Sequence, residues 1–245
     1  MSTPPERVSS SAWVRSVFFS QTTRVLTLPR TRALGAIALL VGVVPASLGG
    51  MTISTGGEQP HRLPGTLGLV GLVALGCLGG CLAGAMDRGG DAAVSLLAVP
   101  RRGVLAGARI ASLIMTVAPP ALAIGGVDRL IRSWTDPGAG HSPAPPAWAL
   151  LTGYLFAVVA FALVGMALSV ILSNAVLAVS ILSLVPVLLL PRVGRWCPLL
   201  VRLLPYSACG AALTGPGRVT AVLELAGWAV VAAAFYTIRL LHGNG

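Results

Sequence analysis

The feature that most constrains this chain is an uncharged apolar run from Ala147 to Leu190, 44 residues in length. As one α-helix the run would be roughly 66 Å long, against a bilayer core of about 30 Å. It therefore predicts two membrane crossings joined by a tight reversal, over 147–172 and 175–190. Ser173 and Asn174 are the best turn signal inside it, because such side chains hydrogen-bond the backbone in turns.

Composition extends this interpretation to the whole chain. Of the 245 residues, 55% are hydrophobic and 10% are charged, whereas soluble domains carry about a quarter charged residues. The net charge is +10, and all 17 basic residues are arginines. They stand at the ends of apolar runs, which favours membrane anchoring over a nucleic-acid-binding patch. We expect the surface of the chain to contact the lipid bilayer and not a nucleic acid.

The absence of lysine from the sequence excludes several catalytic classes. P-loop nucleotide binding, Ser-x-x-Lys hydrolysis and Schiff-base chemistry all require a lysine. His61 and His141 stand alone in predicted outer loops and make no metal set. We expect no catalytic residue, no metal site and no cofactor bound by this chain.

Four further apolar runs are long enough to cross a bilayer, which takes about 20 residues. The fold class expected is therefore an all-α membrane protein with six transmembrane helices. An amphipathic helix over 10–28 precedes them and is suited to the headgroup layer. Pro119 and Pro120 are expected to break the third crossing midway. The four further crossings span 33–53, 63–86, 107–127 and 219–241.

Within the second crossing, Gly76, Gly80 and Gly84 recur at four-residue spacing and allow another helix to approach closely. Cys77 and Cys81 share one face of this crossing, where small apolar packing is a better interpretation than metal or redox chemistry.

Arginine distribution sets the predicted orientation. Six crossings place both termini on one side, and that side holds ten arginines against seven on the other. The bias is small but favours cytoplasmic termini under the positive-inside rule. The predicted location is the inner membrane of a bacterium, as a multi-pass protein.

The loop over 87–106, between the second and third crossings, is the main polar insertion on the inner side. Asp91 suits the N-cap of a short helix over 92–99, and Pro100 ends that helix. A short capped helix between two membrane helices is suited to docking onto a soluble partner. On these residues alone, a solvated turn with interfacial arginines explains the segment equally well.

The order of these features resembles the membrane subunits of bacterial ABC exporters of the multidrug and bacteriocin (lantibiotic) type. The resemblance covers nearly the whole chain and is carried by six crossings, the interfacial helix and the inner loop. In the loop, the family pattern is matched at Arg88, Gly90, Leu96, Ala98, Val99, Pro100, Arg101 and Arg102. The chain departs from the pattern at the start of the loop, where the family's Glu, Tyr and Thr fall on Met86, Asp87 and Asp91.

This resemblance implies an export permease that pairs with a second copy or a sister permease and with two soluble ATPase subunits, which bind ATP and Mg. The inner loop would be the coupling helix that contacts the ATPase. Its implied contact residues are Asp87, Arg88, Gly90, Asp91, Leu96, Leu97, Val99, Pro100, Arg101 and Arg102. A peptide antibiotic, a hydrophobic drug or a lipid would be the substrate. The alternatives are a non-transporting immunity or scaffold protein and an intramembrane enzyme, although no motif for the latter is present.

The basic loop over 191–218 carries two further expectations. Leucines at helical spacing alongside Arg202, together with the resemblance, predict a re-entrant hairpin that caps the exit between helices 5 and 6. A surface helix held by lipid headgroups is the alternative. Cys197 and Cys209 both fall in this loop, where an extracytoplasmic disulfide is chemically permitted and free thiols are the alternative.

Candidate residues of a substrate path or exit cap are Tyr154, Phe156, Phe161, Arg202 and Glu224. The aromatic side chains have ordinary packing as their alternative. Glu224 lies inside the predicted sixth crossing, where an acid is a functional candidate by default. Its alternative is an interfacial residue paired with Arg218.

Overall fold

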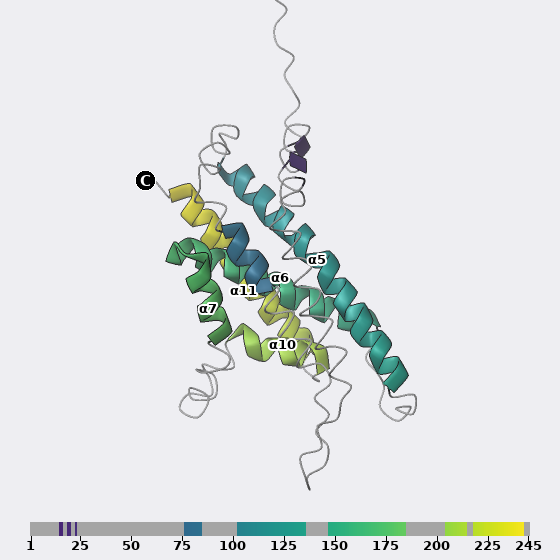
Figure 1. Ribbon diagram of the computed structural model, residues 1–245. Helices are drawn as coiled ribbons and strands as arrows, with labels where there is room; N and C mark the ends of the chain where they lie inside the picture. The colour runs from purple at the N-terminus through teal and green to yellow at the C-terminus, as the bar shows by residue number, and fades with distance from the viewer. Residues whose placement is uncertain are drawn as a thin grey trace, which may run out of the picture.

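The computed structural model describes residues 15, 16, 19, 20, 23, 76–84, 102–135, 147–184, 204–214 and 218–242 (Figure 1). All regular structure in these ranges is helical, and the helices are α5 (Arg102–Thr135), α6 (Ala147–Leu172), α7 (Ala175–Leu184), α10 (Pro205–Thr214) and α11 (Arg218–His242). Residues 76–84 form one further helical segment. Three of the described helices are long and apolar enough to cross a membrane, over Arg102–Val127, Leu151–Leu172 and Arg218–His242.

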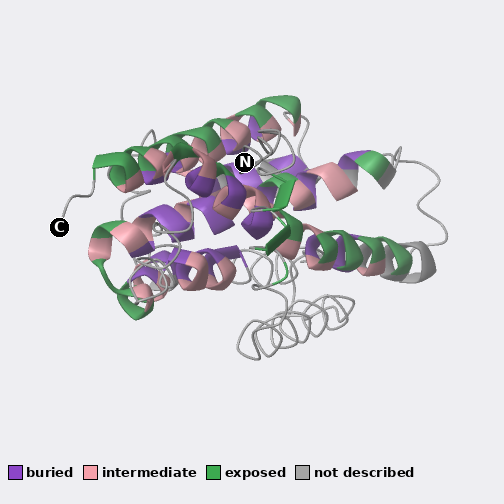
Figure 2. Cartoon of the chain, turned by 90° about the horizontal axis from the view of Figure 1, so that it is seen from above, coloured by how far each residue is buried: buried purple, intermediate pink, exposed green. Residues whose placement is uncertain are grey.

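α6 is the centre of the helix bundle. It packs against α5, α7, α10 and α11, and buried residues gather along it in Figure 2. The helix contains no charged residue and is apolar on every side, as expected of a helix with neighbours all round. Its observed bounds, Ala147–Leu172, are those of the helix predicted for the fourth crossing.

The reversal between α6 and α7 is also confirmed. Ser173 takes a positive φ of 54°, and α7 begins two residues later at Ala175. The Asn174 side chain caps this helix, because its Oδ1 accepts hydrogen bonds from the Val176 amide at 2.9 Å and the Leu177 amide at 3.2 Å. These bonds satisfy amides that have no partner within the helix.

α5 is longer and more continuous than predicted. It runs through Pro119 and Pro120 without a break, so the expected interruption is wrong. Each proline removes one backbone donor, a loss that membrane helices tolerate when neighbouring groups and packing compensate. Here Val117 and Ala121 flank the prolines and are buried against α6, whereas Pro119 is exposed. The helix also continues into the predicted outer loop, as far as Thr135.

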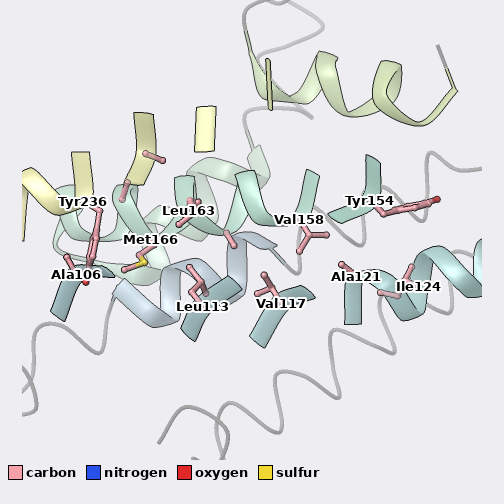
Figure 3. Close-up of a cluster of buried hydrophobic side chains, with 13 residues drawn as sticks. Ala106, Leu113, Val117, Ala121, Ile124, Tyr154, Val158, Leu163, Met166 and Tyr236 are labelled. Carbon is pink, nitrogen blue, oxygen red and sulfur yellow. The ribbon is translucent and has the colours of Figure 1, made fainter. Parts of the chain in front are cut away.

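A core of apolar side chains joins α5, α6 and α11. Figure 3 shows side chains along one face of α5, from Ala106 to Ile124, opposite Val158, Leu163 and Met166 of α6. Tyr154 lies near one end of this cluster and Tyr236 of α11 near the other, and both are almost fully buried. The cluster fixes α5 and α11 on α6.

The outward face of α11 carries large apolar side chains. Val219, Leu223, Val230 and Ile238 are each more than half exposed. Exposed apolar faces of this kind are unfavourable in water but suit contact with lipid. The exposed sides appear in green on the outer helices of Figure 2.

The described residues of the N-terminal segment are helical, as the sequence predicts for 10–28. Arg15, Ser16, Phe19, Ser20 and Thr23 are helical and exposed, and the Phe19 side chain is 65% exposed. Thr23 Oγ1 donates to the Phe19 carbonyl at 2.8 Å, the i to i−4 bond of a helix. The rest of the helix expected over 10–28, and the first crossing, lie outside the described residues.

Candidate functional site

The glycine stripe of the second crossing packs against α6. A Cβ atom at Gly76 would lie 2.7 Å from the Val158 carbonyl oxygen, and one at Gly80 would overlap the Ala162 carbonyl. At Gly84 the added atom would meet Ser169 Oγ at 2.6 Å. The close approach that the spacing predicts is therefore made within the chain, against α6.

α6 contributes a glycine of its own to this contact. A Cβ at Gly165 would lie 2.8 Å from the Cys77 carbonyl oxygen. Hydrogen bonds cross the same interface, from Ser169 Oγ to the Cys81 carbonyl at 3.0 Å and from Cys81 Sγ to the Gly165 carbonyl at 3.5 Å. Close backbone approach and polar cross-links of this kind hold membrane helices together, because lipid supplies no hydrophobic driving force between them.

The cysteines of segment 76–84 lie in an apolar environment. Cys77 is 2% exposed and Cys81 is fully buried, both in a cluster with Phe161, Leu182 and Cys209. Within the described ranges, no group of three His, Cys, Asp or Glu side chains is arranged to hold a metal ion. Their position agrees with the predicted packing role.

At one end of the bundle, α5 and α11 are joined directly. Arg102, the first residue of α5, donates from Nη1 to the carbonyl oxygen of Leu241 at 3.2 Å. The carbonyls of the last turn of a helix have no partner within that helix, so a guanidinium there both bonds them and complements the helix dipole. Deeper in the bundle, Arg109 of α5 lies close enough for its charge to act on the Tyr236 phenol of α11.

Arg102 is the only one of the ten predicted ATPase contacts, which lie in 87–102 and are called the coupling segment here, that the described ranges include. The other predicted ATPase contacts lie outside them: Asp87, Arg88, Gly90, Asp91, Leu96, Leu97, Val99, Pro100 and Arg101. Arg102 is partly buried and directed to α11, which gives it a role inside the bundle that the sequence did not indicate. A contact joining residues 139 positions apart leaves no local sequence signal.

α10 is held in the core by contacts with α6 and α7. The Tyr206 hydroxyl donates to the Leu182 carbonyl of α7 at 2.6 Å, and its ring lies 4.8 Å from the Phe161 ring, centroid to centroid. Cys209 of α10 is 1% exposed and packs in the same cluster as Cys77 and Cys81. Burial, and then the nearby Glu224 carboxylate, raise the pKa of the Cys209 thiol to about 12.

Only one cysteine of the possible outer-loop disulfide, Cys209, lies in the described part of the chain. Cys209 is a free thiol, turned into the packed core. Its predicted partner Cys197 lies outside the described residues, as does the candidate cap residue Arg202.

The predicted aromatic path residues do not come together. Tyr154 and Phe161 are fully buried in two different core clusters, and a Cβ at Gly125 would lie 3.0 Å from Tyr154 Cδ2. Phe156 is 37% exposed. These positions correspond to the packing alternative.

Glu224 is the last of the residues predicted for a substrate path or exit cap. It lies on α11 where that helix packs against α10, and it is partly exposed. Its Oε1 atom is buried, and among the described residues no group donates a hydrogen bond to it. Across the helix interface, its charge lies close enough to act on the Cys209 thiol of α10.

Comparisons of the chain with protein-family models, with curated proteins and with solved structures find no match.

Proposed function

We propose that this chain is the transmembrane subunit of an ATP-driven exporter in the inner membrane of a bacterium. It would pair with a second permease, identical or related, and with two soluble ATPase subunits that bind ATP and Mg. The three membrane-capable helices and the lipid-suited face of α11 support the membrane assignment. The order of the crossings and the Val-Pro-Arg-Arg sequence before α5 support the exporter type.

The hydrogen bond between Arg102 and Leu241 is the observation that carries this proposal. Arg102 ends the predicted coupling segment and begins α5. A displacement of the segment by an ATPase would act on α5 directly and on the end of α11 through this bond. Both helices pack on α6, so the movement would reach the centre of the bundle. Switching by small helix shifts at such contacts is an established way to couple two sites.

The position of α10 supports an exit cap. It contacts Phe161 near the middle of α6 and Leu182 near the middle of the predicted fifth crossing. It also shares a core cluster with Cys77, near the middle of the predicted second crossing. A ten-residue helix that meets three crossings near their midpoints would lie inside the bilayer, as a re-entrant helix does. α10 would then be the second half of the predicted hairpin.

Reconstitution tests the proposal. The full chain is co-expressed with a soluble ABC ATPase encoded beside it, and the complex is purified and placed in proteoliposomes. We expect ATP hydrolysis that rises when cargo is added, and Arg101→Glu should abolish this stimulation while the complex still assembles. The proposal would be overturned if the chain forms no complex with an ATPase. It would also be overturned if the rate of ATP hydrolysis changes neither with added cargo nor in Arg101→Glu.

A further inference from the structure

Glu224 has an unusual position for an acidic residue in this chain. The sequence has seven Asp and Glu residues, and Glu224 alone falls within a predicted crossing. The structure places it in α11, over one turn from the first residue of a helix that is long and apolar enough to span a membrane. A carboxylate in such a helix is costly unless it meets water, a cation or hydrogen-bond donors.

The groups around Glu224 do little to offset the cost of placing a carboxylate in an apolar helix. Its Oε1 is buried without a hydrogen-bond donor among the described residues. α10 presents the Cys209 thiol, which stays uncharged at neutral pH. Neither α6 nor α10, the helices packed beside this part of α11, contains a basic residue.

None of the described arginines near α11 bonds the buried oxygen of Glu224. Arg102 and Arg109 of α5 act at the opposite end of α11, on Leu241 and Tyr236. Arg218, at the start of α11, precedes Glu224 by more than one turn, and its Nε atom donates no hydrogen bond to the buried Oε1 of Glu224. The carboxylate charge is therefore left without a cation of the described chain bonded to its buried oxygen.

The groups around Glu224 fit an organic cation. Trp228 lies one turn further along α11 and is partly buried, so carboxylate and indole share one side of the helix. An anionic oxygen beside an aromatic ring is the combination that binds ammonium and phosphonium groups. The Glu224 residue as a whole is partly exposed, while its Oε1 atom is buried.

We propose that Glu224 binds the positively charged group of an amphipathic organic cation where α10 meets α11. In naming that cation as cargo, the inference rests on the export function proposed above. The ligand would carry one delocalised or alkylated positive charge, and its apolar part would lie against the adjoining helices. The same charge could come from the amine of a lipid headgroup, and the experiment separates these two sources.

Binding of tetraphenylphosphonium to the purified full chain in neutral detergent tests the site. We expect saturable binding that weakens about tenfold in Glu224→Gln, the change expected when one partly buried charge pair is lost. Glu58→Gln removes the same charge from the predicted outer loop and should leave the affinity unchanged. Tetraphenylborate, an anion of the same shape, should bind at least tenfold more weakly than the cation.

Equal affinity of the unaltered chain and Glu224→Gln, or equal affinity for cation and anion, would overturn the site. Displacement of the probe by equimolar phosphatidylethanolamine would assign the site to a headgroup and overturn the assignment to cargo. Glu224→Asp keeps the charge and should retain most of the binding, so a loss confined to Glu224→Gln is not a folding defect. The assay needs no ATPase, so its failure leaves the proposed export function to its own test.

Discussion

Arg102 at the start of α5 donates a hydrogen bond to the carbonyl of Leu241 near the end of α11, at 3.2 Å. This bond joins the last residue of the predicted coupling segment to a helix near the C-terminal end of the chain. It places the first turn of α5 and the last turn of α11 at one end of the bundle (Figure 1). A displacement of the coupling segment would therefore act on both α5 and α11.

Removing this bond should loosen the joined helix ends. Arg102→Ala leaves the last carbonyls of α11 to solvent, and we expect the free energy of unfolding to fall by about 1 kcal/mol. Titration with a denaturing detergent, followed by circular dichroism, measures it. Arg239→Ala removes an equal charge from the exposed side of the same helix end and should change stability by less than half as much. Equal losses from the two variants would mean that charge alone, and not the bond, matters.

The glycine contact between segment 76–84 and α6 should tolerate no side chain. Gly80→Ala puts a Cβ into the Ala162 carbonyl, and we expect a loss of about 3 kcal/mol because backbone must move. Gly227→Ala is the matched control, since no neighbouring atom lies within 4 Å of its added Cβ. That variant should be neutral or more stable by about 0.5 kcal/mol, as alanine favours the helix. A tolerated Gly80→Ala would show that the two helices are further apart.

The Asn174 cap should decide how firmly α7 begins. Asn174→Ala removes the acceptor for the Val176 and Leu177 amides, at a cost of about 1 kcal/mol. Hydrogen exchange by mass spectrometry should show faster exchange at those two amides, with α6 unaffected. Asn174→Asp keeps an acceptor and should preserve the protection. If exchange in Asn174→Ala stays unchanged, the cap is not formed.

The Cys209 thiol should be unreactive in the folded chain. Its side chain is 1% exposed and packs among apolar residues, so a reagent cannot reach it and its reactive thiolate form is disfavoured. Maleimide labelling read by mass spectrometry should modify Cys209 at pH 8 only after denaturation. A peptide pair linked through Cys197 and Cys209 under non-reducing conditions would instead restore the predicted disulfide.

The sequence was sufficient where the physics is local. The bounds of α6 follow from an uncharged run too long for one crossing, and the reversal follows from two turn-forming residues, Ser173 and Asn174. α11 was expected over 219–241 and spans Arg218–His242, because charge and helix ends mark both boundaries. Such features depend on neighbours in the chain.

The sequence was insufficient where distant residues meet. The spacing of Gly76, Gly80 and Gly84 predicts close approach but names no partner, because any helix with a smooth face would fit. Pro119 and Pro120 were expected to break α5, and only the packing of the flanking residues on α6 explains why they do not. Tyr154 and Phe161 were candidates for a path because aromatic residues line paths and cores alike, and the structure puts both in cores.

Site-specific photocrosslinking tests the central claim most directly. A photoreactive amino acid replaces Leu97 of the predicted coupling segment in the full chain, and cells are irradiated before the membranes are purified. The account predicts one major adduct, with a cytoplasmic ABC ATPase. The yield of this adduct should fall when the photoreactive residue at position 97 is combined with Arg101→Glu. A segment that crosslinks only to lipid, or that is reached from outside by a membrane-impermeant reagent, would contradict it.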